Sequence, residues 1–251
     1  MITDKNDGVR RAIVVGASSG LGAGVAATLA SMGWRVGIAA RRGDALEAIS
    51  ARFEQGQVIT AVIDVNRENA PERLRGLIER LGGVDLYFHA SGMGKRNPGL
   101  EMGVELDTVT TNVVGFTRMV GAAFNYMAEN GGGQIAVVSS VAGTKGLGFA
   151  PSYSASKAFD SCYVQALEQL AVMRSLPITF TDVRPGFVST PLLSGSRYPM
   201  LMGCDYAVKC IVKAVLAGRH VAVVDWRWRL LVAVWRRVPR WLWRRLPMAL
   251  K

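Results

Sequence analysis

The segment from Ala12 to Trp34 constrains the fold more than any other part of the chain. It opens with a short apolar run that ends at Val15 and continues into a turn that contains three glycines. A run that is apolar on both faces suits a strand covered by helices on both sides. After the turn, apolar residues recur at the spacing of an amphipathic helix: Val25, Ala26, Leu29 and Ala30.

Apolar runs and helical patterns alternate in the same way as far as residue 224. The expected strands are residues 12–15, 35–40, 58–65, 84–89, 134–138, 180–183 and 220–224. Strands that alternate with helices form a parallel sheet, so we predict an α/β fold: a Rossmann-type, doubly wound sheet of about seven strands in three αβα layers. We expect one domain over residues 1–225, followed by a basic, Trp/Arg-rich amphipathic tail over residues 226–251.

The uncharged segment 12–34 also has about the length of a membrane span. Its glycines and paired serines suit a strand, a turn and a helix much better than one lipid-facing helix. Residues 1–7 include acids ahead of any apolar run, which is wrong for a secretory signal peptide. The three cysteines and two histidines lack the spacing of a metal site. We therefore expect a cytoplasmic protein that holds no metal.

The glycines of the first turn predict a binding site for a dinucleotide. Gly16, Gly20 and Gly22 lie between the predicted strand and helix, which is the context that a dinucleotide fingerprint requires. Glycines let the backbone approach a pyrophosphate, and the free N–H groups at the helix start stabilise its charge.

Two arginines after the second strand indicate which dinucleotide binds. Arg41 and Arg42 follow the strand 35–40, where an acidic residue would bind the ribose hydroxyls of NAD. Arginine accommodates the 2′-phosphate of NADP instead, so we predict NADP(H) as the cofactor. The alternative is that both arginines only cap a solvated loop.

Tyr153 and Lys157, spaced one helical turn apart, form a second candidate site. On a helix they project from the same face. A phenol with an unperturbed pKa of about 10 is a poor acid or base at neutral pH, and a nearby ammonium favours the phenolate. The pair therefore suits proton transfer. Ser139 and Ser140 follow the strand 134–138, and ligands of open parallel sheets bind at that edge.

These features together resemble the short-chain dehydrogenase/reductase family from about Arg11 to Val224. The glycine spacing, the Tyr-x-x-x-Lys pair and the segment 185–190, which reads Pro-Gly-x-Val-x-Thr, match the family's motifs in the family's order. Ser140 is preferred over Ser139 because its separation from Tyr153 equals the family spacing. The catalytic residues that the resemblance implies are Asn112, Ser140, Tyr153 and Lys157.

In the family, the asparagine bends a helix and holds a water of the proton relay, and the lysine also binds the nicotinamide ribose. We expect the cofactor to contact the fingerprint glycines, the two arginines and further positions that the resemblance implies. They are Gly16, Ser18, Ser19, Gly20, Leu21, Gly22, Arg41, Arg42, Asp64, Val65, Ala90, Ser91, Gly92, Tyr153, Lys157, Pro185, Gly186, Val188 and Thr190.

The chain departs from the family pattern at two places. Val15 stands where the family usually has threonine, which removes one hydroxyl. His89-Ala-Ser-Gly92 stands where the family typically has Asn-Asn-Ala-Gly. Gly92 still lets the backbone pass the cofactor closely. We interpret His89 as a hydrogen-bonding substitute, with a new catalytic base as the alternative.

The segment 192–203 is expected to be the substrate loop. Its apolar side chains favour a hydrophobic substrate. The alternative is that they pack under the loop or in a subunit contact. They are Leu192, Leu193, Tyr198, Pro199, Met200, Leu201 and Met202.

The C-terminal tail contains five of the six tryptophans, and eight of the net +11 charges of the chain. Pro239 must break or kink its helix. A basic amphipathic segment with tryptophan suits an anionic membrane surface, which would place the protein at the inner face of a membrane. Packing on a sister subunit is the second interpretation. Trp228, Leu231, Trp235, Val238, Leu242 and Leu246 fall on one side of the helical wheel, and Arg229, Arg236, Arg237, Arg240 and Arg244 on the other.

Nucleic acid is not expected as a partner, because the rest of the chain offers no basic groove or base-reading motif. The resemblance implies a homodimer or homotetramer that acts on a small molecule. We expect an NADP(H)-dependent oxidoreductase that interconverts a ketone and a secondary alcohol, with a hydrophobic or lipid-like substrate as a narrower hypothesis. The alternatives are a lyase or epimerase on the same fold, and a dinucleotide-binding interaction protein without turnover.

Overall fold

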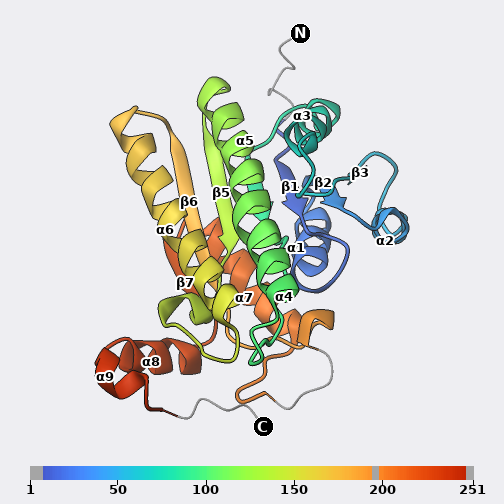
Figure 1. Cartoon of the computed structure of the whole chain (residues 1–251). Helices are drawn as coiled ribbons and strands as arrows, with labels where there is room; N and C mark the ends of the chain where they lie inside the picture. The colour runs from blue at the N-terminus through green and yellow to red at the C-terminus, as the bar shows by residue number, and fades with distance from the viewer. Residues whose placement is uncertain (1–7, 194–197, 247–251) are drawn as a thin grey trace.

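The computed structural model describes residues 8–193 and 198–246, which contain a seven-stranded sheet (Figure 1). The strand order is β3-β2-β1-β4-β5-β6-β7, and every neighbouring pair is parallel. The prediction of a Rossmann-type α/β fold with about seven strands is confirmed. The strands are β1 (Arg11–Val15), β2 (Arg35–Ala40), β3 (Val58–Val62), β4 (Leu86–His89), β5 (Gly133–Val138), β6 (Ile178–Arg184) and β7 (Val221–Val223).

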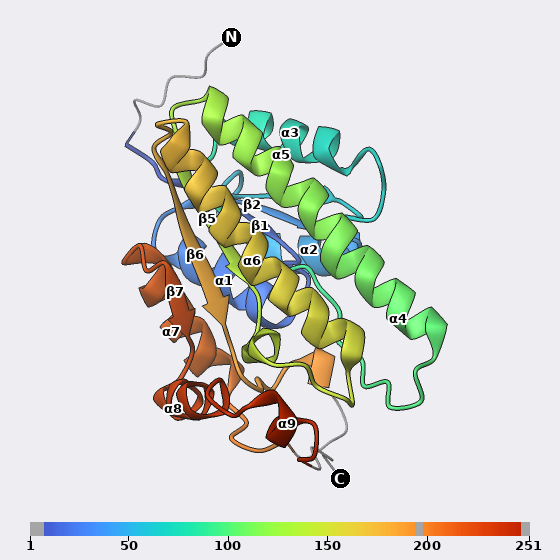
Figure 2. The same ribbon diagram turned by 60° about the vertical axis from the view of Figure 1, so that its left-hand side comes forward.

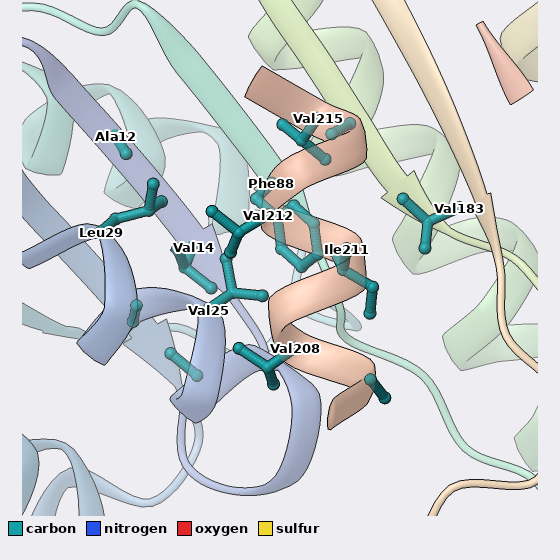
Figure 3. Packing of buried hydrophobic residues seen from close by; sticks show 14 of the residues in the cluster. Ala12, Val14, Val25, Leu29, Phe88, Val183, Val208, Ile211, Val212 and Val215 are labelled. Atoms are coloured by element: carbon teal, nitrogen blue, oxygen red, sulfur yellow. The ribbon is translucent and has the colours of Figure 1, made fainter. Parts of the chain in front are cut away.

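Strand β1 is buried along its whole length and divides the core into two layers. Ala12 and Val14 face a layer formed with the helices α1 (Gly20–Ser31), α2 (Gly43–Ser50) and α7 (Cys204–Leu216). Figure 3 shows the side chains of α1 and α7 meeting there, among them Val25 and Val212. The segment 12–34 is therefore a strand, a turn and a helix. No helix among the described residues is long and apolar enough to cross a membrane.

The opposite layer lies under the helices α3 (Ala70–Leu81), α5 (Phe116–Glu129) and α6 (Pro151–Met173). Ile13 and Val15 of β1 face this side, where they pack among side chains such as Leu77 of α3 and Phe124 of α5. Figure 2 shows α5 and α6 running alongside one another over this face. Helices on both faces explain why the strands are almost continuously apolar.

The helical segment that contains Asn112 is interrupted by a π-helical turn. The helix α4 (Met102–Val109) leads into a π-helical turn over Thr110–Gly115, and α5 follows without a break. Asn112 lies in this turn. A π-helical turn changes the direction in which a helix presents its side chains and is frequent at functional sites.

The C-terminal segment forms the helices α8 (Trp226–Trp235) and α9 (Arg240–Trp243), and Pro239 separates them as expected. Both lie beyond the carboxyl ends of the strands (Figures 1 and 2). Trp228 and Trp235 of α8 are buried in the same core layer as α1 and α7. The side of the helix that was predicted to be apolar therefore packs on its own chain. Residues 1–7, the middle of the substrate loop (194–197) and the end of the tail (247–251) lie outside the described residues.

Candidate active site

One cavity of about 1520 Å³ lies at the carboxyl edge of the sheet. Every residue predicted for catalysis or cofactor binding lines it except Asn112. These predicted residues come from the glycine turn, from the ends of β2 to β5, from α6 and from the segment after β6. Parallel strands place their carboxyl ends at one edge, so residues far apart in the sequence meet there.

The glycine turn is packed against the end of β4 so tightly that no side chain fits between them. Gly16 has a φ of +86°, and a Cβ built on it would lie 2.4 Å from the backbone nitrogen of Ser91. A Cβ on Gly22 would lie 2.3 Å from the carbonyl oxygen of Gly16. These positions require glycine, and the turn leaves the N–H groups at the start of α1 next to the cavity.

Arg42 lies across the glycine turn. Its guanidinium donates hydrogen bonds of 3.0 Å to the hydroxyl oxygens of both Ser18 and Ser19. Arg41 also lines the cavity. Guanidinium groups, hydroxyls and the positive end of a helix are the donors that bind phosphate groups. The residues present therefore fit a phosphorylated dinucleotide.

The two serines after β5 have different partners. The hydroxyl of Ser139 donates to the carboxylate of Asp182, and its oxygen also lies 3.2 Å from the carbonyl oxygen of Val183. The hydroxyl oxygen of Ser140 accepts a hydrogen bond from the N–H of Ala142 at 3.1 Å, and the hydroxyl makes only a long contact of 3.4 Å with a carbonyl. The hydroxyl of Ser139 is therefore used in a hydrogen bond to a strand residue. The hydroxyl of Ser140 can still donate a hydrogen bond to a ligand in the cavity.

Lys157 is buried beside Tyr153 and is paired with a carboxylate that the sequence analysis did not single out. Its ammonium donates to the carbonyl of Val138 at 2.9 Å and to Asp160 at 2.8 Å. Burial by itself lowers the pKa of Lys157, but the charge of Asp160, together with Tyr153 and Asp182, raises the pKa above its ordinary value. The lysine is therefore held in its charged form.

Asp160 is completely buried, and that burial raises the pKa of its carboxyl although the adjacent ammonium opposes the shift. The sequence contains a pattern that could have identified Asp160 as the partner of Lys157. Asp160 follows Lys157 by three positions, which places both on one face of a helix.

Asn112 lies behind the cavity and connects two of its walls. Its side-chain amide donates to the carbonyl of Met93 at 2.8 Å and to the hydroxyl of Ser156 at 3.0 Å, and its oxygen accepts from the N–H of Met93 at 2.8 Å. The asparagine thus joins the loop after β4 to α6 beside Lys157. Its part in a proton relay stays a prediction.

His89 is buried at the end of β4 and does not line the cavity. Its Nδ1 forms a 2.9 Å hydrogen bond with the hydroxyl of Tyr87, and its ring packs edge-on against Phe116. Burial, reinforced by the charge of Lys157, lowers the pKa of His89 to about 3. A neutral, enclosed imidazole agrees with a hydrogen-bonding substitute and not with a catalytic base.

The low pKa of His89 predicts a loss of stability in mild acid. The unfolded chain binds a proton near the ordinary pKa of 6.5, whereas the folded chain stays neutral down to about 3. The contribution of His89 to the free energy of unfolding therefore falls as the pH drops from 6.5 toward 3, by at most about 1.4 kcal/mol per pH unit. Denaturant titrations at two pH values, one above and one below 6.5, should show a smaller decrease for His89→Asn than for the native chain. Equal decreases would contradict the assignment.

The predicted substrate loop divides between the cavity and the core. Leu193, Tyr198, Pro199 and Met200 line the cavity. Met202 is buried in the core, where its backbone bridges to the segment after β6. The side chain of Leu192 lies outside the described residues.

The C-terminal helices form a wall of the cavity that the sequence analysis did not anticipate. Three indole N–H groups fix this wall. Trp228 donates to the carbonyl of Met200 at 3.3 Å, and Trp235 donates to the hydroxyl of Thr144 at 2.7 Å. Trp243 donates to the carbonyl of Gly146 at 2.8 Å. The wall residues are Trp228, Leu231, Val234, Trp235, Val238, Trp243 and Leu246.

Gly186 shows how closely this wall approaches the predicted cofactor segment. A Cβ built on Gly186 would lie 2.1 Å from the indole ring of Trp228. Phe187 packs edge-on against the same ring, with centroids 5.4 Å apart. The helical spacing of the tryptophans predicted an apolar face, but the surface that this face covers depends on the fold.

Comparison with known proteins agrees with this architecture. The family model of the short chain dehydrogenases matches residues 10–199. An uncharacterized oxidoreductase of Myxococcus xanthus is 36% identical over 233 residues, which cover 89% of this chain and 89% of the relative.

Two crystal structures have the same fold. A variant of actinorhodin polyketide ketoreductase, crystallised with NADPH, is 25% identical with a TM-score of 0.74, and the match covers 86% of this chain and 95% of that one. A short chain dehydrogenase of Burkholderia cenocepacia in complex with NADP is 22% identical with a TM-score of 0.82, over 96% and 98% of the two chains. With its family motifs gathered around one cavity of a parallel α/β sheet, the chain belongs to the short-chain dehydrogenase family.

Proposed function

We propose that the chain is an NADP(H)-dependent oxidoreductase that interconverts a ketone and a secondary alcohol. The observation that carries the proposal is that Ser140, Tyr153 and Lys157 line the same cavity as the glycine turn and Arg42. The similar ketoreductase, which is crystallised with NADPH, supports both the reaction and the cofactor.

Proton transfer is the part of the reaction that the chain's own side chains perform. The cofactor, when bound, supplies hydride to the carbonyl carbon or accepts it from the alcohol. The hydroxyl of Tyr153 donates a proton to the carbonyl oxygen in reduction and takes one back in oxidation. Ser140 donates a hydrogen bond to the same oxygen and orients it. The ammonium of Lys157 stabilises the phenolate of Tyr153.

Lys157 is positioned for this role by its own partners. An ammonium has three N–H donors, and the Val138 carbonyl and Asp160 occupy two of them. The remaining donor serves the cofactor ribose or a relay water. Asn112 acts as a positioning residue, because it holds the loop at Met93 against α6.

The cofactor is held by the residues that line the rest of the cavity. Arg41 and Arg42, with the hydroxyl of Ser18, would bind the 2′-phosphate, and the glycine turn would bind the pyrophosphate. Asp64 and Val65 would lie beside the adenine. Backbone at Val188 and the hydroxyl of Thr190 would hold the nicotinamide amide.

The substrate is hydrophobic. The cavity that contains Tyr153 is also lined by tryptophans and aliphatic side chains of the C-terminal segment, and by Leu147 and Phe149. Apolar walls with a few convergent polar groups suit an extended apolar substrate that carries one carbonyl. A lipid-like keto compound, such as a keto-acyl or keto-sphingoid compound, fits this description. A cytoplasmic location at a membrane surface and a homodimer or homotetramer remain part of the proposal.

NADPH consumption across a panel of ketones tests the function. The panel contains short ketones, steroids, keto-acyl thioesters and keto-sphingoid bases. We expect turnover that favours long apolar substrates. Turnover confined to short soluble ketones would refute the substrate class. A product formed without cofactor oxidation would favour a lyase or epimerase, and the absence of any turnover would favour an interaction protein.

Two adjacent leucines of α8 test the apolar wall. Leu231 lines the cavity, whereas Leu230 is 61% exposed and does not line it. Leu231→Ala removes apolar contact with the substrate, so kcat/KM for a long-chain ketone should fall by about 5- to 30-fold. Leu230→Ala is the matched control and should keep the native value. An equal decrease of kcat/KM in both variants would show that the C-terminal wall does not contact the substrate.

A further inference from the structure

The outer side of α8 carries a second apolar stripe, opposite the one that packs on the core. Trp226, Leu230 and Val234 follow one another at four-residue spacing, and they are 67%, 61% and 59% exposed. Trp241 of α9 is 58% exposed as well. Tryptophan is seldom left this open to water, and a group of exposed large apolar side chains marks an interaction site.

Arginines border this stripe. At 100° per residue, Arg229 and Arg236 lie along one edge of the stripe and Arg237 lies at its C-terminal end. All three are exposed. The segment 226–251 contains seven arginines, one lysine and no acidic residue.

We propose that this outer face, defined by Trp226, Leu230 and Val234 with the bordering arginines, docks on the surface of an anionic lipid bilayer. Apolar side chains of an amphipathic helix enter the boundary between headgroups and acyl chains, and tryptophan prefers this boundary. The arginines pair with the anionic headgroups. The face that meets the lipid is therefore the side of α8 opposite Trp228 and Trp235, whose indoles are bound to their own chain.

Charge and polarity favour lipid over the other possible occupants. A second copy of the chain is a poor partner for an arginine-rich face, because the remainder of the chain is itself net positive, with three of the eleven charges. A nucleic acid would place phosphates against the apolar stripe, whereas interfaces with nucleic acids are polar.

The outer face adjoins the substrate cavity, and this connection rests on the proposed function. Val234 and Leu246 both line the cavity and are 59% and 40% exposed. The cavity therefore opens next to the surface that meets the lipid. An apolar substrate enters from the bilayer along the C-terminal helices without crossing water.

Vesicle binding by the full-length chain, without cofactor or substrate, tests the docking. We expect sedimentation with vesicles of phosphatidylcholine and phosphatidylglycerol, weak sedimentation with phosphatidylcholine alone, and release by salt. The double variant Trp226→Ala and Leu230→Ala should bind the anionic vesicles about tenfold more weakly. Arg229→Gln and Arg236→Gln should each weaken that binding by about fivefold.

Leu231→Ala is the matched control, because Leu231 faces the cavity. This variant should keep native vesicle binding, whereas Leu230→Ala should lose part of it. The outer-face variants should unfold at the same temperature as the native chain and should turn over a short soluble ketone at the same rate. A loss of vesicle binding in these variants would then result from lost docking and not from misfolding. Since binding is read without substrate, a failed function assay leaves this test intact.

Three results would overturn the proposal. The first is equal binding, or no binding, to the neutral and anionic vesicles. The second is a change of oligomeric state in the outer-face variants by light scattering, which would assign the face to a second copy. The third is tighter binding to RNA than to anionic vesicles, lost in the arginine variants.

Discussion

We expect Tyr153→Phe to lower kcat by about 10²- to 10⁴-fold, which is the usual contribution of a positioned general acid. The substitution removes one hydroxyl and leaves a ring of nearly the same shape beside Gly94 and Lys157. NADPH binding, measured by fluorescence titration, should therefore stay close to the native affinity. Stopped-flow or steady-state NADPH oxidation with the preferred ketone measures the loss of turnover.

Tyr163→Phe is the matched control for this experiment. Tyr163 lies on the same helix, α6, but packs between Phe116 and Phe159 away from the cavity. Its substitution should leave turnover near the native level. Activity of Tyr153→Phe within a few-fold of the native chain would refute the proton-transfer role. A parallel loss of NADPH binding would instead point to a structural role for the tyrosine.

We expect Arg42→Ala to raise the KM for NADPH by about 10- to 100-fold and to leave the KM for NADH almost unchanged. A hydrogen bond to a charged group contributes about 1.5–3 kcal/mol, which corresponds to that range. The guanidinium of Arg42 donates hydrogen bonds to the hydroxyls of Ser18 and Ser19 in the glycine turn. In the proposed function this guanidinium would bind the 2′-phosphate, which NADH lacks. Initial-rate kinetics with both cofactors measure the selectivity.

Arg52→Ala provides the control for charge alone. Arg52 is an exposed arginine just beyond α2, and it does not line the cavity. Its loss should change neither KM by more than about twofold, since long-range effects of exposed charges are screened. If Arg42→Ala weakened NADPH and NADH equally, the arginines would only cap the loop, and the prediction of NADP(H) would be wrong.

Local patterns in the sequence were sufficient for most of the fold. The run that ends at Val15, the glycines of the turn and the helical spacing after it specify a strand, a turn and a helix within one short segment. Boundaries were less accurate: the third strand was expected to reach Val65, but β3 ends at Val62. Asp64 and Val65 instead follow the strand and line the cavity. A strand end depends on its partner, and the pairing of β3 with β2 stops at Val62.

The sequence also predicted most of the residues that line the candidate site. The glycine turn, Arg42, Ser140 and the Tyr153–Lys157 pair all line the expected edge of the sheet. Asp160 was not predicted from the sequence, although its spacing from Lys157 places both residues on one face of a helix. An ion pair matters most when it is buried, and the spacing of residues along a helix does not show whether they are buried. His89 was recognised as a departure, but its isolation from the cavity depends on neighbours such as Phe116 from a distant helix.

The sequence by itself determined the parallel α/β fold, the edge of the sheet where the site forms and the residue types that the site contains. These properties follow from short-range spacing and from the rule that parallel strands end together. Only the tertiary structure decided which surface the C-terminal helix covers. The helix has apolar residues on two sides, and periodicity predicts that a face is buried without identifying its partner. Contacts between Trp228 and Gly186, and between Trp235 and Thr144, direct one side to the cavity and leave the other side open.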